Sequence, residues 1–174
     1  MDFFELIQAR RSIRFYKPQA VEEEKLKRIL EAANLAPSAG NLQAYLILIV
    51  RDAATRQALA GASLNQEFVA QAPVLLAFFA LPQLAAAKYR SRGVELYSLQ
   101  DATIACTYAQ LAATALGLAT VWIGAFDDAA VKRVLKAKAE WRPVALLPIG
   151  YAAESPKPTR RRPLAALALE ANTL

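Results

Sequence analysis

A long uncharged stretch, residues 102–126, limits the possible folds of this chain more than any other segment, because it contains no Asp, Glu, Lys or Arg. As a helix this stretch would be long enough to cross a bilayer. Polar side chains interrupt it, however, among them Tyr108, Gln110 and four threonines, and Gly117 divides it in two. We therefore interpret it as a buried helix followed by a buried strand, and we expect no membrane partner.

A helix that is apolar on all sides needs cover on all sides. The chain has 174 residues, which is enough for one well-buried domain and short for two. In a domain of this size, a second subunit is the expected source of part of the cover. The sequence therefore predicts a single domain over residues 1–174 that forms a homodimer.

Strand-like and helix-like patterns alternate along the rest of the chain. Apolar runs predict strands at residues 45–50, 74–80, 120–123 and 144–149, the first two of the type covered on both faces. Amphipathic and capping patterns predict helices at residues 2–9, 22–36, 53–60, 66–70 and 95–117 and after Asp127, with a last apolar stretch at 164–169. This interleaving predicts a mixed α/β or α+β fold.

One connection, residues 81–93, shows no such pattern. It contains Pro82, Gly93 and three basic residues. Proline and glycine are the strongest breakers of regular structure, so the sequence predicts a mobile surface connection here.

The chain contains no histidine, and this absence excludes several chemistries. It removes Ser–His and Cys–His nucleophile pairs, most zinc sites and histidine general bases. No phosphate loop, dinucleotide fingerprint or hydrolytic pair of carboxylates is present, and no metal site is expected. If the protein is an enzyme, a cofactor carries its reaction.

The redox compartment can be predicted from a single residue, Cys106, which cannot form an internal disulfide and has apolar neighbours. No signal-peptide pattern is seen at residues 1–7, which are amphipathic and already acidic. Both observations predict a reducing, cytoplasmic environment.

The net charge of +6 is concentrated in two short clusters, residues 10–14 and 160–162, with three arginines in each. Compact clusters suit a small phosphate better than a long polyanion. No aromatic platforms or known nucleic-acid motifs accompany them, so no nucleic-acid partner is expected. For any single arginine, a solvated surface position remains an alternative.

Four separated segments carry candidate binding groups. They are residues 10–16 (RRSIRFY), 36–45 (APSAGNLQAY), 116–126 (LGLATVWIGAF), and 148–151 (PIGY) with 160–164 (RRRPL). The first offers cations and a hydroxyl to an anion, because arginine forks match phosphate oxygens. The second places amide side chains directly before a predicted strand. In their order and spacing the four segments resemble the FMN-dependent nitroreductase family.

The resemblance implies a fold and an activity. The fold is α+β with three layers: helices flank a central, mostly antiparallel sheet, and a long buried helix lies at the dimer interface. The implied enzyme binds FMN, takes a hydride from NADH or NADPH, and passes two electrons to a small-molecule acceptor by a ping-pong mechanism. Nitroaromatics, quinones and free flavins are the implied acceptors. A non-catalytic protein that stores or senses FMN is the alternative.

The resemblance also implies roles for individual residues. Arg14 is implied to be the catalytic positive charge near flavin N1 and O2, because Phe68 stands where larger relatives have a second cation, a lysine. Gly124 is implied to place its backbone N–H beside flavin N5, a second catalytic role. The other implied cofactor-binding residues are Arg10, Arg11, Ser12, Pro37, Ser38, Ala39, Asn41, Gln43, Asn65, Gln66, Ile123, Ala125, Arg160 and Arg161.

Some of these assignments leave alternatives open. Asn65 and Gln66 are equal candidates for an amide near the pyrimidine edge of the flavin. Among the tail arginines, Arg161 matches the phosphate-binding position best and Arg160 next. The loop at residues 36–45 is implied to pack on the flavin ring, partly across the dimer interface.

Overall fold

The computed structural model describes residues 2–171 and is built around an antiparallel sheet. The strands are β1 (Tyr45–Val50), β2 (Val74–Ala80), β3 (Ala119–Thr120) and β4 (Arg142–Gly150), in the spatial order β1-β2-β4-β3. Every neighbouring pair in this sheet is antiparallel. The predicted strands at residues 45–50 and 74–80 are confirmed with the expected bounds.

Helices surround the sheet. In chain order the helical segments are α1 (Phe3–Ala9), α2 (Glu23–Asn34), η1 (Ala39–Asn41), α3 (Ala53–Ala62), α4 (Phe68–Gln71), α5 (Pro82–Arg92), η2 (Gly93–Tyr97), α6 (Ser98–Ala115), α7 (Asp128–Leu135) and η3 (Leu164–Ala166).

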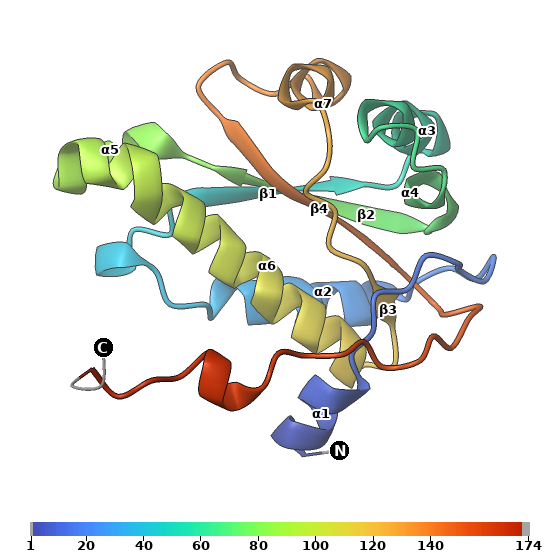
Figure 1. The fold of residues 1–174 in the computed structure, drawn as a ribbon. Helices are drawn as coiled ribbons and strands as arrows, with labels where there is room; N and C mark the ends of the chain where they lie inside the picture. The colour runs from blue at the N-terminus through green and yellow to red at the C-terminus, as the bar shows by residue number, and fades with distance from the viewer. Residues whose placement is uncertain (1, 172–174) are drawn as a thin grey trace.

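The architecture has three layers (Figure 1), because α2 and α6 cover one face of the sheet while α3, α4 and α7 cover the other. Alternate residues of β2 point into the two cores, Leu76 and Phe78 towards α2 and α6, Leu75 and Phe79 towards the other three helices. All of β2 is buried, which explains its unbroken apolar sequence. The three-layer α+β fold is therefore confirmed.

Local signals in the sequence define several helix ends. At α1, the Asp2 side chain accepts the N–H of Glu5 and the Glu5 side chain accepts the N–H of Asp2, a capping box. Asp127 caps α7 by accepting the N–H of Ala130 at 2.8 Å. After α6, Gly117 adopts φ +74°, a left-handed conformation that terminates helices.

The expected mobile connection at residues 81–93 is wrong, because this segment is helical in α5 and η2. Pro82 occupies the first turn of α5, where a missing N–H costs nothing. Ala85 is fully buried, and a Cβ added at Gly93 would lie 2.4 Å from its carbonyl oxygen. The absence of a side chain at Gly93 thus allows η2 to pack closely against α5. Gly93 is part of the helix packing and does not interrupt the helical structure.

Two burial predictions also need correction. β1 is an edge strand with mostly half-buried side chains, and Ile49 is exposed, so it is not covered on both faces within one chain. α6 likewise buries only one side, leaving Thr103, Thr107 and Tyr108 exposed. The predicted strand at 120–123 pairs regularly only at β3, with an isolated bridge from Ile123 to Leu146.

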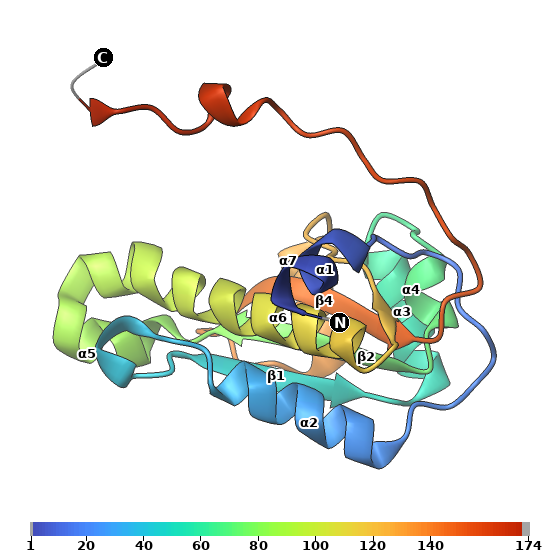
Figure 2. The same ribbon diagram turned by 90° about the horizontal axis from the view of Figure 1, so that it is seen from below.

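After β4 the chain leaves the layered body. Figure 2 shows this tail running away from the other elements. The tail exposes Leu164, Leu167 and Leu169. Within residues 2–171, no helix combines the length and apolar character needed to cross a membrane.

Candidate functional site

The first arginine segment is fixed beside β3 and the start of the tail. Ser12 forms a parallel bridge with Thr120, and the Ile13 N–H donates to the Thr120 carbonyl at 3.0 Å. Two further backbone bonds join residues 15 and 17 to residues 153 and 151. These contacts bring the first, third and fourth candidate segments together, although more than a hundred residues separate the first from the other two.

A carboxylate from the tail strengthens this junction. Glu154 accepts the backbone N–H groups of Arg14 and Phe15, the latter at 3.2 Å. The buried Tyr16 hydroxyl donates to the Ile13 carbonyl at 2.8 Å. Burial raises the pKa of Tyr16, and the negative charge of Glu154 raises it further, so this hydroxyl stays protonated and keeps its role as a donor.

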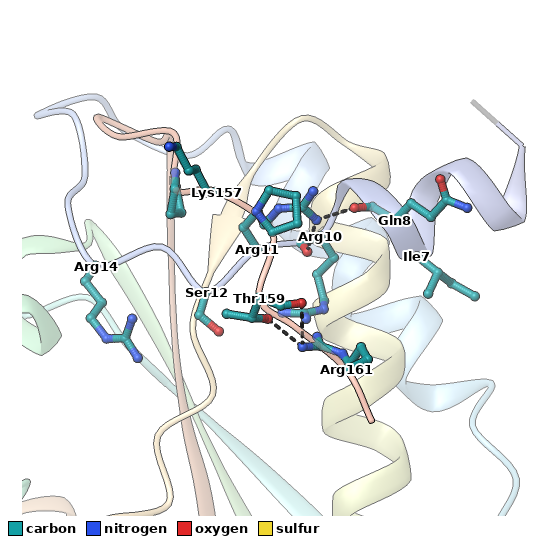
Figure 3. Close-up of a pocket in the computed structure, with 11 residues that line it drawn as sticks. Ile7, Gln8, Arg10, Arg11, Ser12, Arg14, Lys157, Thr159 and Arg161 are labelled. Atoms are coloured by element: carbon teal, nitrogen blue, oxygen red, sulfur yellow. Dashed lines mark hydrogen bonds between the residues drawn. The ribbon is translucent and has the colours of Figure 1, made fainter. Parts of the chain in front are cut away.

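A pocket of about 630 Å³ opens where the first segment, α1 and the tail meet (Figure 3). Five of its eleven lining residues are basic, and none of the described residues that line it is acidic. The full lining consists of Ile7, Gln8, Arg10, Arg11, Ser12, Arg14, Pro156, Lys157, Pro158, Thr159 and Arg161.

The electrostatics of the pocket favour an anion. Burial lowers the pKa of the Arg10 guanidinium, and the positive charges of Arg161 and then Arg11 lower it further. Like charges held together in this way repel one another, and an anion between them relieves that repulsion. The donors present therefore fit a phosphate group.

The arginines of this region differ in how their donors are used. Arg11 donates to the backbone carbonyls of Gln8 and Arg10, so part of its guanidinium serves the end of α1. Arg161 donates to the Thr159 side chain at 2.5 Å. The structure does not bring Arg160 into the pocket, although the sequence made it a candidate.

Arg14 lies apart from the other arginines. Figure 3 shows its guanidinium on the far side of Ser12 from Arg10 and Arg161. The guanidinium carbon is 5.7 Å from the centroid of the Phe68 ring, a cation–π distance. Phe68 stands where the resemblance suggested that a cation had been lost, and its ring holds the cation that remains.

The third segment follows α6 and continues beyond β3, and its residues Ile123, Gly124 and Ala125 are not among those that line the arginine pocket. Backbone bonds in both directions join Ile123 to Leu146, each at 3.0 Å, and the exposed Gly124 follows directly. The Gln66 side chain donates to the carbonyls of Ala125 and Ser63 at 3.1 and 2.8 Å.

The candidates Asn65 and Gln66 therefore differ in their surroundings. The side-chain nitrogen of Gln66 is used within the protein, whereas Asn65 is exposed at φ +58°. Asn65 is the better placed of the two to meet a ligand.

A buried hydroxyl adds a further polar group. The Thr120 side-chain oxygen is buried and has no hydrogen-bond partner among the described residues. Thr120 lines a smaller pocket of about 270 Å³ that shares Arg10 and Arg11 with the first. A buried polar atom normally has a partner, so this one is consistent with a ligand or solvent nearby.

The second candidate segment lies elsewhere in the chain. Its loop contacts Asp101 near the beginning of α6, whereas Thr114, near the end of that helix, lines the pocket shared by Arg10 and Arg11. Along a helix this separation is about 20 Å, since each residue rises 1.5 Å. One chain alone therefore does not bring Pro37, Ser38, Ala39, Asn41 and Gln43 to the arginine pocket.

Several residues of the site were missed from the sequence. Lys157 and Thr159 line the pocket, Glu154 holds the first segment beside it, and Asp101 holds the separate loop of the second segment. Lys157 lies between two prolines, which favour an extended chain. The one sequence signal for its role was its position four residues before Arg161, on the same extended segment. Nothing in the sequence marked the two acidic residues, since their partners are distant backbone groups.

Comparison with known proteins places these features in a family. The sequence model described as Nitroreductase family matches residues 7–66 and 59–151. An NADH dehydrogenase of Thermus thermophilus is 34% identical over 182 aligned residues, covering 89% of this chain and 89% of the relative.

Solved structures agree with the sequence comparison. B. megaterium NfrA2 has a TM-score of 0.88 and 30% identity, covering 97% of this chain and 73% of the other. The NADPH:FMN oxidoreductase from Vibrio harveyi, complexed with NAD+, has a TM-score of 0.89 and 27% identity, covering 97% and 76%. The chain therefore belongs to the nitroreductase family.

Proposed function

We propose that the protein is an FMN-dependent oxidoreductase that takes a hydride from NADH or NADPH and passes two electrons to an organic acceptor. The observation that carries this proposal is the pocket shared by the first segment and the tail, whose described lining holds five basic residues and no acidic one. A flavin mononucleotide brings a phosphate group suited to that lining. Among the similar solved structures, the Vibrio harveyi protein is an NADPH:FMN oxidoreductase.

The phosphate is bound by the first segment and the tail. Arg10, Lys157 and Arg161 supply positive charge, and Ser12 and Thr159 supply hydroxyl groups. Arginine forks bind phosphate oxygens in pairs, and fixed donors lose little freedom on binding.

The flavin, when bound, supplies the redox chemistry by accepting a hydride and releasing two electrons. Arg14, which Phe68 and Glu154 hold in position, would supply a positive charge to stabilise the negative charge that develops on the ring. Gly124 offers a backbone N–H without a side chain that would obstruct the reacting face. No acid–base side chain is needed, which agrees with a chain that lacks histidine.

The active form is a homodimer of single FMN-binding domains. None of the side chains of α1 is buried within one chain, and a helix of seven residues is not stable alone in water. The open side of α6 and the tail leucines add further surface for a second copy to cover.

Dimer symmetry also completes the site. Around a twofold axis, two α6 helices packed antiparallel bring the beginning of one helix to the end of the other. The loop at residues 37–43 of one subunit then lies beside the arginine pocket of its partner. Both donor and acceptor use this one composite pocket in turn, so the kinetics are ping-pong.

The visible spectrum of the purified protein tests the cofactor, and anaerobic addition of NADH and of NADPH tests the reaction. Flavin bands that bleach on addition of either nucleotide are expected, and the faster of the two identifies the donor. Bound flavin that fails to bleach would contradict the proposed enzyme activity and indicate a storage or sensing protein.

The kinetic mechanism is tested with nitroaromatic, quinone and flavin acceptors. Parallel double-reciprocal lines are expected, and intersecting lines would contradict the ping-pong mechanism. A cytoplasmic location remains a prediction from the single cysteine.

A further inference from the structure

A buried carboxylate that takes no part in the reaction outlined above lies beneath the loop at residues 38–44. Asp101 on α6 is 2% exposed. One carboxylate oxygen accepts the N–H of Ala39 at 2.9 Å, and the other accepts the N–H of Ala44 at 3.2 Å. No lysine or arginine within residues 2–171 forms an ion pair with it. The cost of burying this charge is offset by two backbone donors from a single loop.

The loop itself depends on outside support. Gly40, Asn41 and Gln43 have φ of +56°, +57° and +50°, and the last two are not glycines. Side chains disfavour this left-handed region, so such a run persists only where its surroundings hold it. Inside the loop, the Gln43 N–H donates to the Ser38 hydroxyl at 3.0 Å. Asp101 supplies the other support, because it binds both ends of the loop at once.

We propose that Asp101 is a positioning residue that sets the shape of this loop and thereby the contact that the loop makes with FMN in the partner's pocket. The second half of this statement rests on the proposed function, whereas the first half does not. A carboxylate is required because it presents two acceptors and no donor. An asparagine offers one acceptor and an NH₂ group, which would face one of the two N–H groups.

The test compares Asp101→Asn with Gln110→Leu. Gln110 is also a buried polar residue on α6, at 8% exposure, and lies on the opposite flank of its buried side. Gln110→Leu therefore shows how the loss of a buried polar side chain from this helix affects stability alone. Amide exchange at Ala39 and Ala44 is measured by NMR in protein stripped of FMN, and FMN affinity and the flavin absorption band are measured in reloaded protein.

We expect Asp101→Asn to speed exchange at Ala39 and Ala44, weaken FMN binding about tenfold and alter the flavin band, since one N–H loses its acceptor. Gln110→Leu should leave the exchange of these two amides and the FMN affinity unchanged. Unchanged exchange in Asp101→Asn would overturn the proposal. So would losses of FMN affinity that follow thermal stability equally in both variants. If the wild-type protein binds no FMN, the proposed function fails, while the exchange data still decide whether Asp101 shapes the loop.

Discussion

At the scale of single residues, the basic pocket depends on where each arginine points. Arg160 and Arg161 are adjacent in sequence, yet only Arg161 lines the pocket. Arg161 also lies close enough to Arg10 to lower its pKa. The sequence left Arg160 and Arg161 as the candidate phosphate-binding residues of the tail. The path of the backbone places only Arg161 in the lining of the pocket.

We expect Arg161→Gln to weaken FMN binding about tenfold to a hundredfold, because a charge-assisted bond to phosphate contributes about 1.5–3 kcal/mol. Arg160→Gln is the matched control and should bind FMN as the wild type does. Flavin fluorescence titrations at two salt concentrations measure both. Equal losses in the two variants would show that only the overall charge of the tail matters.

Arg14 should affect the reaction more than binding. Replacing Arg14 with Gln removes charge stabilisation during flavin reduction and leaves the phosphate contacts intact, so reduction should slow about tenfold or more while FMN affinity changes little. Stopped-flow bleaching by NADH or NADPH, with a parallel FMN titration, separates the two effects.

Phe68→Leu provides a second view of the same charge. It keeps Arg14 but removes the ring beneath its guanidinium, and cation–π contacts contribute about 0.5–1 kcal/mol at exposed sites. Flavin reduction should therefore slow about two- to fivefold. A loss of FMN affinity without slower reduction in Arg14→Gln would contradict the role given to this residue.

Among the helices and strands, two glycines have opposite structural roles, close packing between helices and helix termination, which the sequence alone did not distinguish. Gly93 permits the close packing of η2 on α5, whereas Gly117 terminates α6 in a left-handed conformation. The predicted connection at residues 81–93 is helical because Pro82 lies in the first turn of α5 and Gly93 packs against Ala85, so neither residue interrupts a helix.

The conformational role of Gly117 can be tested with Gly61 as a matched control. A Cβ at either position would meet nothing within 4 Å, so any difference in stability comes from the backbone. Gly117→Ala should destabilise the protein by about 1 kcal/mol because φ is positive there. Gly61→Ala, inside α3, should stabilise it by about 0.5 kcal/mol. Urea unfolding measures both; a stabilised Gly117→Ala would contradict the assignment.

At the scale of the whole molecule, the single chain leaves unusual surface uncovered. Tyr108 on α6 and Phe4 on α1 are exposed, as are three leucines of the tail. The loop at residues 37–43 also lies about 20 Å from the arginine pocket along α6. The proposed twofold dimer would cover the exposed apolar surface and bring the loop of one subunit to the arginine pocket of its partner.

A charge placed on the open side of α6 should separate the subunits. Tyr108→Arg places two like charges in the interface, one from each copy, and should weaken dimerisation more than about a hundredfold, which corresponds to roughly 3 kcal/mol. Ala129→Arg, on the exposed side of α7 across the sheet, is the control and should remain dimeric. Sedimentation velocity measures the dimer fraction. FMN affinity should fall with dissociation, and a monomer that retains full affinity would rule out a composite site.

Elements whose causes are local or periodic could be predicted from the amino-acid sequence. The apolar runs of β1 and β2, the capping box at Asp2 and the glycine after α6 all act over a few residues, so their bounds could be predicted. The family likewise followed from four ordered segments. Which segments meet depends on long-range packing, which pairs Ser12 with Thr120, stacks Arg14 on Phe68 and buries Asp101 beneath a distant loop. These contacts link positions far apart in the chain, and no local pattern records them, because the backbone groups and rings involved are common to many sequences.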